Sequence, residues 1–286
     1  MKKILIFTNN LAKHKKLTQL FSEDDIKIMV SEYSDLSFAI NGKNSKVTLY
    51  SNGEDIRNFA KIIILATPEH SKNHVFSALA CYCRKYNIPI LDDQFTNISG
   101  KLYALWRFWE KDIPTAKTFF GPRDFMVQGL HEINGSGILK SINGTKGRDN
   151  YLVNSNQELL DILDKNPDTP FILQNFIPND GDWRIILINY EPKLAIYRSS
   201  HGKDYRNNTS VGGDAKLVPL DDVNPRIIEL SIAASKALGI KIAGADIMQD
   251  DKTSEYTVLE VNRTPQLVSG AFTDEKQEII RNLIRS

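Results

Sequence analysis

The chain has 286 residues, of which 41% are apolar and 25% are charged, as in a folded globular protein of two or three compact units. Its net charge of +1 gives no general attraction for nucleic acid or for an anionic membrane. The only cysteines are Cys81 and Cys83, which excludes a disulfide framework and indicates a reducing compartment. No apolar run approaches the roughly 20 residues of a membrane span, and the first one is too short for a signal peptide, so we expect a cytoplasmic protein.

Strands and helices alternate at the start of the chain. Apolar runs predict strands at 3–8, 26–30, 46–50, 61–66 and 88–91. Asn41-Gly42 predicts a hairpin turn, and Thr67-Pro68-Glu69 predicts a helix start, because proline is tolerated in the first helical turn. This βαβ alternation predicts a small α/β domain over residues 1–95.

Residues 96–170 are expected to form a second unit. Its first helix begins at Ser99-Gly100-Lys101 and ends before Pro114. The apolar residues expected on the buried side of this helix are Leu102, Leu105, Trp106 and Trp109. Strands are predicted at 115–119 and 138–142 with a helix at 124–131 between them, and Ser155 with Glu158 forms the capping-box pattern of a helix over 156–165.

Residues 171–286 predict a third unit with several hairpins, so the fold class is α/β with an α+β C-terminal part. Strands are expected at 171–177, 183–189, 194–200, 242–248 and 256–262. Tyr190-Glu191-Pro192 would form a turn, residues 201–216 a long loop, and residues 223–238 a helix that ends at Gly239. A final helix is predicted near 274–285.

Three oxygen-bearing side chains lie on the last two predicted strands. Successive side chains of a strand point to opposite faces, so Glu260 and Asn262 share one face, about 7 Å apart. If the two strands pair antiparallel in an even register, Asp246 joins this face. A carboxylate inside an apolar strand is costly unless it is paired or binds a metal. Two carboxylates and an amide oxygen suit Mg²⁺, whereas a hydrogen-bonded polar network is the alternative.

Lys140 comes near the end of the strand at 138–142, and a turn with Gly144 and Gly147 follows it. Glycines permit the close backbone approach that a phosphate cradle needs, and Lys140 and Lys146 would supply positive charge. The segment is neither a P-loop nor a complete dinucleotide-binding fingerprint. A surface hairpin with solvated lysines is the alternative.

A predicted hinge and two arginines complete the candidate site. The hinge residues, which could offer backbone groups to an adenine edge, are Gln174, Asn175, Phe176 and Ile177. Asp182 follows shortly after and could accept hydrogen bonds from ribose hydroxyls. Arg184 and Arg198 lie on adjacent predicted strands, and arginine suits a carboxylate or a transferring phosphoryl group. An ordinary strand and turn, and a solvated charged face, are the respective alternatives.

The order of these features resembles the ATP-grasp superfamily, and most closely its RimK-type carboxylate–amine ligases with their glutathione synthetase-like ATP-binding domain. The resemblance covers nearly the whole chain and is strongest from about residue 99 to residue 270. It implies an ATP-grasp fold. In that fold a Rossmann-like pre-ATP-grasp domain, 1–95, precedes a lid subdomain, 96–170, and a C-terminal subdomain with the metal site, 171–286.

The resemblance also implies a role for each candidate residue. The ATP phosphates would be contacted by Lys101, Lys140 and a closing loop, Asn143–Asp149, that includes Gly144, Thr145 and Gly147. The adenine would lie at Gln174, Asn175, Phe176 and Ile177, and the ribose near Asp182. The substrate carboxylate and its acyl phosphate would be held by Arg184 and Arg198. Two Mg²⁺ ions, with Mn²⁺ as a substitute, would be bound by Asp246, Glu260 and Asn262, with Asn208 at their edge.

The implied activity is an ATP-dependent ligation on an amino acid, a peptide or a protein, in which a carboxylate becomes an acyl phosphate that an amine then attacks. A ribosomal-peptide macrocyclase of the same superfamily and an inactive nucleotide-binding scaffold are the alternatives. Nucleic-acid binding has only the basic patch Lys13-His14-Lys15-Lys16 in its favour. No membrane partner is expected, and a homo-oligomer is left open.

The chain departs from the family pattern at three places. Asn175 replaces a frequent glutamate, Arg148-Asp149 replaces a smaller pair, and Pro265-Gln266 replaces Pro-Gly. These departures leave the expected metal and phosphate positions unchanged, so we expect them to bear on the substrate.

Overall fold

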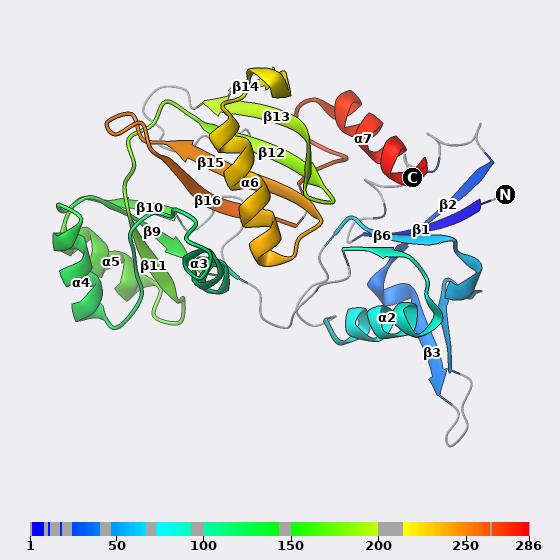
Figure 1. Ribbon diagram of the computed structural model, residues 1–286. Coiled ribbons are helices and arrows are strands. Elements are labelled where there is room, and N and C mark those ends of the chain that lie inside the picture. Colours follow the sequence, from blue (N-terminus) through cyan, green and yellow to red (C-terminus); the bar gives the residue numbers. More distant parts are fainter. Residues whose placement is uncertain are drawn as a thin grey trace.

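A computed structural model describes residues 2–8, 11, 18, 25–40, 47–66, 73–92, 100–142, 150–199, 214–263 and 265–285. The described strands form four sheets, and the strands of one small sheet, β3 to β5, lie in sequence between strands of the first (Figure 1). Among the described helices, none is long and apolar enough to cross a membrane.

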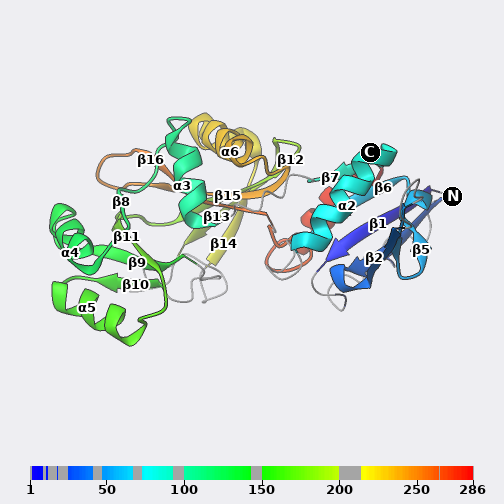
Figure 2. The same ribbon diagram turned by 90° about the horizontal axis from the view of Figure 1, so that it is seen from below.

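The first sheet is parallel, as the βαβ alternation predicted, and has the order β2-β1-β6-β7. Its strands are β1 (Lys2–Thr8), β2 (Ile26–Glu32), β6 (Lys61–Ile64) and β7 (Ile90–Leu91). The helix α2 (Asn73–Tyr86) packs on one face of this sheet through Phe76 and Leu79, which contact a core that includes Phe7 and Ile62 (Figure 2). An antiparallel sheet of β3 (Leu36–Ile40), β4 (Val47–Ser51) and β5 (Glu54–Asp55) lies beside it. The predicted turn at Asn41-Gly42 and the predicted helix start at Thr67 lie outside the described residues.

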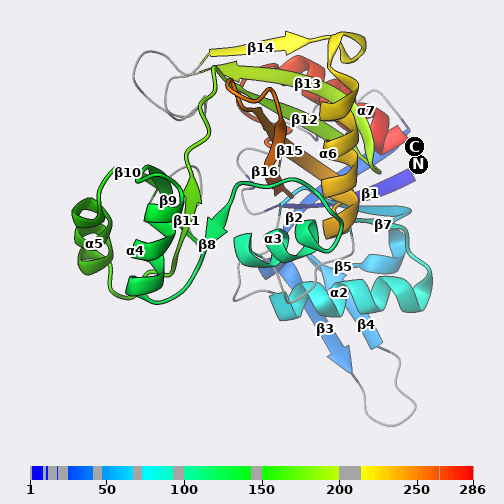
Figure 3. The same cartoon turned by 60° about the vertical axis from the view of Figure 1, so that its left-hand side comes forward.

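The second sheet has the order β10-β9-β11-β8 and is antiparallel. Its strands are β8 (Thr118–Phe119), β9 (Gly137–Ser141), β10 (Asn150–Val153) and β11 (Phe171–Asn175), so the sheet extends past residue 170. The helices α4 (Arg123–Glu132) and α5 (Asn156–Lys165) pack on the same side of it (Figure 3). The Ser155 hydroxyl caps α5 as predicted, but Glu158 accepts its hydrogen bond from the Asn154 amide.

The third sheet is antiparallel and has the order β14-β13-β12-β15-β16. Its strands are β12 (Asp182–Ile188), β13 (Glu191–Ser199), β14 (Asp214–Val218), β15 (Ile242–Gln249) and β16 (Tyr256–Asn262). The helix α6 (Pro225–Leu238) covers one face (Figure 3) and ends at Gly239, which takes the left-handed conformation (φ 65°) that favours glycine. The helix α7 (Thr273–Arg285) covers the opposite face.

The helix α7 lies between the first and third sheets (Figure 1). Ile280 and Ile284 belong to one buried cluster with Ile4 of β1 and Ile186 of β12. The Lys61 ammonium also donates a hydrogen bond to the Leu283 carbonyl at 3.0 Å. The third sheet is therefore anchored to the N-terminal unit through its C-terminal helix.

Three predictions about local structure were wrong. Trp106 and Trp109 are 64% and 70% exposed, because α3 (Lys101–Trp109) instead packs Ala104 and Phe108 against α6 and the third sheet. The turn between β12 and β13 is formed by Asn189-Tyr190, both at positive φ, and β13 already begins at Glu191. Part of the predicted loop 201–216 is strand β14, which pairs with β13.

Candidate active site

The candidate residues on the third sheet lie on one of its faces. Arg184 of β12 is paired directly with Asp246 of β15, and Asp246 is paired directly with Glu260 of β16. This agrees with the predicted even register, although a bulge follows at Leu259 and shifts the rest of the ladder. Asn262 lies two residues further along the same face of β16.

The two arginines and two aspartates of this face form one ion-pair cluster. Arg184 holds Asp246 in a bidentate pair, with Nε–Oδ1 at 2.7 Å and Nη2–Oδ2 at 2.6 Å. Arg198 holds Asp182 in the same way, at 2.8 and 2.5 Å, and its Nη2 also lies 3.3 Å from Asp246 Oδ2. Asp182 is therefore buried in a pair with Arg198, and a contact with a ribose would have to compete with that pair.

Burial and charge act in opposite directions on these carboxylates. Burial raises the pKa of Asp182 to about 6, against the effect of Arg198. Burial also acts to raise the pKa of Asp246, but the guanidiniums of Arg184 and Arg198 outweigh it and hold that pKa below its usual value. Asp246 is thus a buried carboxylate that stays ionised because two cations surround it.

Glu260 and Asn262 provide the open side of the cluster. Glu260 is exposed and accepts a hydrogen bond from Asn262 Nδ2 at 2.8 Å, while the same nitrogen lies 3.4 Å from Asp246 Oδ2. The described residues contain no group of three His, Cys, Asp or Glu side chains that could hold a metal. Two carboxylates and an amide oxygen are hard donors that fit Mg²⁺, which keeps several waters and needs few protein ligands. Asn208 lies outside the described residues.

Two lysines lie close to each other near the end of β9. Lys101 of α3 donates hydrogen bonds to the carbonyls of Ser141 at 2.8 Å and Ile142 at 3.3 Å, where β9 ends. Burial lowers the pKa of Lys140, and Glu260 opposes this effect while Lys101 adds to it. Lys140 of the second sheet thus lies close enough to Glu260 of the third sheet for their charges to interact. The turn residues Gly144, Thr145 and Gly147 lie outside the described residues.

The predicted hinge begins where β11 ends. Gln174 is buried and donates a side-chain hydrogen bond to Thr118 Oγ1 at 2.9 Å, so its amide is already engaged. Ile177 is buried, and its carbonyl accepts a hydrogen bond from Asn179 at 2.9 Å. Asn175 Oδ1 is buried and has no hydrogen-bond partner among the described residues. An orphaned acceptor at this point fits a ligand that carries an N–H donor, as the adenine amino group does.

A family model of the RimK-like ATP-grasp domain matches residues 114–286, which is more than half of the chain. The chain belongs to the RimK-like ATP-grasp family. It is 30% identical over 188 residues to a probable alpha-L-glutamate ligase of Mannheimia succiniciproducens. The aligned region covers 63% of this chain and 61% of that protein. It is 29% identical over 247 residues to a glutathione synthetase of Synechococcus elongatus, which covers 79% and 73%. The first glutamate ligases that it matches are thus covered over about three fifths of their own length.

Solved ATP-grasp ligases share the whole fold. The ATP-grasp ligase PsnB, complexed with minimal precursor, Mg and ADP, superposes with a TM-score of 0.75 at 13% identity over 99% of this chain and 96% of that one. The macrocyclase MdnC of Microcystis aeruginosa, bound with its precursor peptide MdnA, has a TM-score of 0.71 at 12% identity over 100% of both chains. The expected ATP-grasp fold is therefore confirmed, from the N-terminal sheet to α7.

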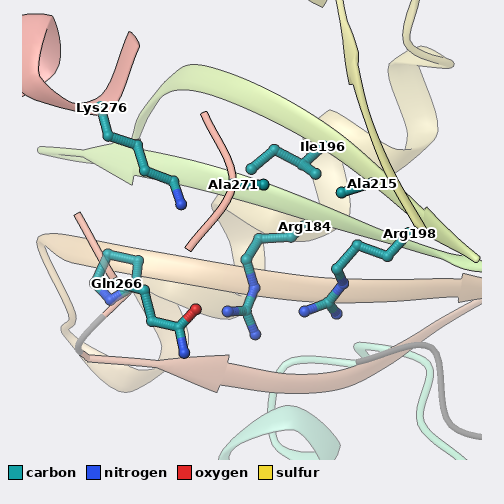
Figure 4. Close-up of a pocket in the computed structure, with 8 residues that line it drawn as sticks. Arg184, Ile196, Arg198, Ala215, Gln266, Ala271 and Lys276 are labelled. Carbon is teal, nitrogen blue, oxygen red and sulfur yellow. The ribbon is translucent and has the colours of Figure 1, made fainter. Parts of the chain in front are cut away.

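Within this ATP-grasp fold, a small pocket opens beside the two arginines (Figure 4). Its polar lining residues are Arg184, Arg198, Gln266 and Lys276. The sequence pointed to Gln266 only as a departure from the family pattern, and Lys276 was missed. The helical spacing could have indicated Lys276, because this lysine lies on the apolar face of α7, three and four residues before Ile279 and Ile280.

Proposed function

We propose that this protein is an ATP- and Mg²⁺-dependent ligase that joins a carboxylate to an amine through an acyl phosphate. The observation that carries the proposal is the continuous row of Arg184, Asp246 and Glu260 across three strands, with Lys140 opposite it, in a chain of the RimK-like ATP-grasp family. We also propose that residues 1–95, 96–170 and 171–286 act as pre-ATP-grasp domain, lid and C-terminal subdomain.

ATP would lie between the second and third sheets. Lys140 and Lys101 would neutralise its phosphates, and Asn175 would accept a hydrogen bond from the adenine amino group. Asp246, Glu260 and Asn262 would hold Mg²⁺, which would supply positive charge to neutralise the ATP phosphates. The loop Asn143–Asp149 and Asn208 are proposed to complete this site.

The arginines would hold the carboxylate that is activated. Both guanidiniums use Nε and Nη2 in the aspartate pairs, and neither Nη1 group is engaged by a described residue. These two Nη1 groups belong to side chains that line the pocket, so each could donate to a substrate oxygen without giving up its aspartate. The aspartates would thereby hold both guanidiniums in a fixed orientation, which is the positioning that phosphoryl transfer requires.

Two bond exchanges make up the reaction. A carboxylate oxygen attacks the γ-phosphorus, the bond to the bridging oxygen of ADP breaks, and an acyl phosphate forms. The amine nitrogen then attacks the acyl carbon, phosphate leaves with the electrons of the C–O bond, and the nitrogen loses a proton to give the amide. Arg184 and Arg198 would stabilise the charge on the transferring group and on the departing phosphate.

The substrate is proposed to be an amino acid or a peptide. The glutamate ligases point to addition of an amino acid, whereas the neighbours solved with precursor peptides point to a peptide whose own side chains are joined. The macrocyclase alternative draws on one specific observation, which is the superposition of MdnC over the entire chain.

An ADP-release screen with Mg-ATP tests the proposal, using free amino acids and acidic or lysine-containing peptides. We expect repeated turnover of ATP to ADP only with a carboxylate and an amine present. Mass spectrometry of the product distinguishes the reactions, because ligation adds an amino acid whereas cyclisation removes one water from a single peptide. Binding of Mg-ADP without turnover on any substrate would instead indicate the inactive scaffold.

A further inference from the structure

The amine step of the proposed reaction needs a group that takes up a proton. A neutral amine that attacks the acyl carbon must release one proton as it becomes an amide. The two arginines that would hold the acyl phosphate line the small pocket drawn in Figure 4, so the proton acceptor is sought among the residues around them. The other polar residues of this lining, within the described part of the chain, are Gln266 and Lys276.

Lys276 is the one group among the described lining residues that can accept this proton. The guanidiniums of Arg184 and Arg198 are not deprotonated in proteins, and the amide of Gln266 is not basic. The carboxylates behind the guanidiniums are engaged in ion pairs with them. The remaining lining residues are apolar, and they are Ile196, Ala215, Pro265 and Ala271.

The contacts of Lys276 leave its lone pair available. Lys276 lies in the first turn of α7, is 4% exposed, and donates one hydrogen bond from Nζ to the Ser269 carbonyl at 3.1 Å. Among the described residues no carboxylate forms an ion pair with it. A carbonyl accepts a hydrogen bond and cannot donate one, so Ser269 engages an N–H group of Lys276 and not the lone pair of its neutral form. The side chain points from α7 toward the space beside Arg184 and Gln266 (Figure 4).

Burial and neighbouring charge keep a fraction of Lys276 neutral. Burial lowers the pKa of Lys276 from 10.5 to about 8, and Arg184 adds to this effect. Glu275, an exposed neighbour on α7, opposes it, and Arg198 is a further cation in the pocket lining. A general base is most effective when its pKa lies near the pH of the reaction, which an ordinary lysine does not satisfy.

Gly270 leaves a space between Lys276 and Gln266. Its φ is 81°, and a Cβ there would lie 3.3 Å from Gln266 Oε1 and 3.6 Å from Lys276 Nζ. Both polar atoms therefore border one small space that a side chain at position 270 would fill. Gln266 presents its amide oxygen to this space, and an oxygen of this kind accepts a hydrogen bond from an N–H group. A hydrogen-bond acceptor and a neutral lysine beside one space suit an arriving amine.

We propose that Lys276 is the general base that takes the proton from the attacking amine in the second step. The nitrogen lone pair forms the N–C bond, and the C–O bond to phosphate breaks with its electron pair going to the phosphate. The proton moves from the nitrogen to Lys276 Nζ, and the ammonium that results lies beside the departing phosphate, whose charge it stabilises. The inference rests on the proposed ligase function, because it takes the arginines to hold the acyl phosphate.

Hydroxylamine separates this step from the formation of the acyl phosphate. It converts acyl phosphates to hydroxamates without a protein base, so hydroxamate reports on the first step alone. The full-length protein is supplied with Mg-ATP and the same free amino acids and acidic or lysine-containing peptides, with and without hydroxylamine. Hydroxamate is measured through its iron(III) complex and the amide product by mass spectrometry. We expect wild type to form both products.

Three variants then test the lysine. Lys276→Met should slow amide formation at least about 100-fold, as loss of a general base predicts, and should keep hydroxamate formation within about twofold of wild type. Lys276→Arg should form the amide as slowly, because a guanidinium keeps the charge but cannot accept the proton. Lys236→Met, which changes an exposed lysine on α6, is the matched control and should keep both rates.

The outcomes separate the base from the ligase function. Amide formation retained in Lys276→Met, or regained in Lys276→Arg, would overturn the inference, the second because a positive charge would then suffice. Loss of hydroxamate together with the amide in Lys276→Met would also overturn it, since the lysine would then serve the first step or the fold. Absence of hydroxamate from wild type with every amino acid and peptide would instead contradict the ligase function, and the base assignment with it.

Discussion

Asp246 and Glu260 are directly paired on neighbouring strands and carry the same carboxylate, but they differ in burial. The Asp246 side chain is 4% exposed and holds Arg184, whose side chain is 13% exposed, in a bidentate pair. Changing Asp246→Asn leaves the buried Arg184 without its counter-charge, which costs about 3–5 kcal/mol. Changing Glu260→Gln alters an exposed residue with one hydrogen bond, which should cost no more than about 0.5 kcal/mol.

Thermal unfolding followed by circular dichroism measures this difference. At about 2–4 °C per kcal/mol for a chain of this size class, Asp246→Asn should melt roughly 6–20 °C below wild type, and Glu260→Gln within about 2 °C of it. Addition of Mg-ADP should raise the melting temperature of wild type but not of Glu260→Gln, because only a protein that binds the ligand is stabilised by it. Equal melting temperatures for the two variants would show that the Arg184 pair does not hold the fold. An undiminished Mg-ADP effect in Glu260→Gln would refute the metal role.

Two further predictions concern the lysines. Lys140→Met should weaken ADP binding at least about tenfold without lowering the melting temperature, because it removes the proposed phosphate contact and also a half-buried cation. A titration of wild type and variant in parallel checks this, and unchanged ADP affinity would exclude the contact. Lys276 has a pKa of about 8 in the folded protein against 10.5 ordinarily, so the unfolded chain binds more protons between these values and the free energy of unfolding should rise with pH there. Urea unfolding at the two ends of that range should show the rise in wild type, and Lys276→Met should lack it.

Much of the fold was predictable because local and tertiary preferences agree in it. The continuous apolar run of β6 indicated a strand buried on both faces, and Gly239 marked the end of α6. The buried face predicted for α3 was wrong at the two tryptophans, since the apolar residues of this helix occur on more than one side. Which side is covered depends on the position of α6, from a segment more than a hundred residues away. Trp106 and Trp109 were therefore misplaced.

The candidate site shows the same difference between residues that local patterns predict and residues that only long-range contacts bring together. Side-chain alternation in β16 placed Glu260 and Asn262 on one face, and the pairing of β15 brought Asp246 to it. The sequence does not show that Arg184 lies directly opposite Asp246, because this contact depends on how a further strand, β12, pairs with β15. Lys276 was missed for a similar reason. A lysine on an apolar helix face becomes informative only when α7 is seen to place it against the arginines.

The lone pairs of the Asp246 and Glu260 carboxylates indicate how Asp246 could hold an arginine and also bind a metal. Asp246 Oδ2 accepts from Arg184 and lies within reach of Arg198 and Asn262, whereas Oδ1 accepts only from Arg184 Nε among the described residues. A carboxylate oxygen has two lone pairs, so Oδ1 retains one for a ligand while the bidentate pair stays intact. In the part of the chain that the structure describes, Glu260 accepts a hydrogen bond from Asn262 only, so it retains more lone pairs. In the proposed site Asp246 would fix Arg184 and offer the metal one oxygen, while Glu260 would be the principal ligand. For this reason the two matched substitutions should separate stability from Mg-ADP binding.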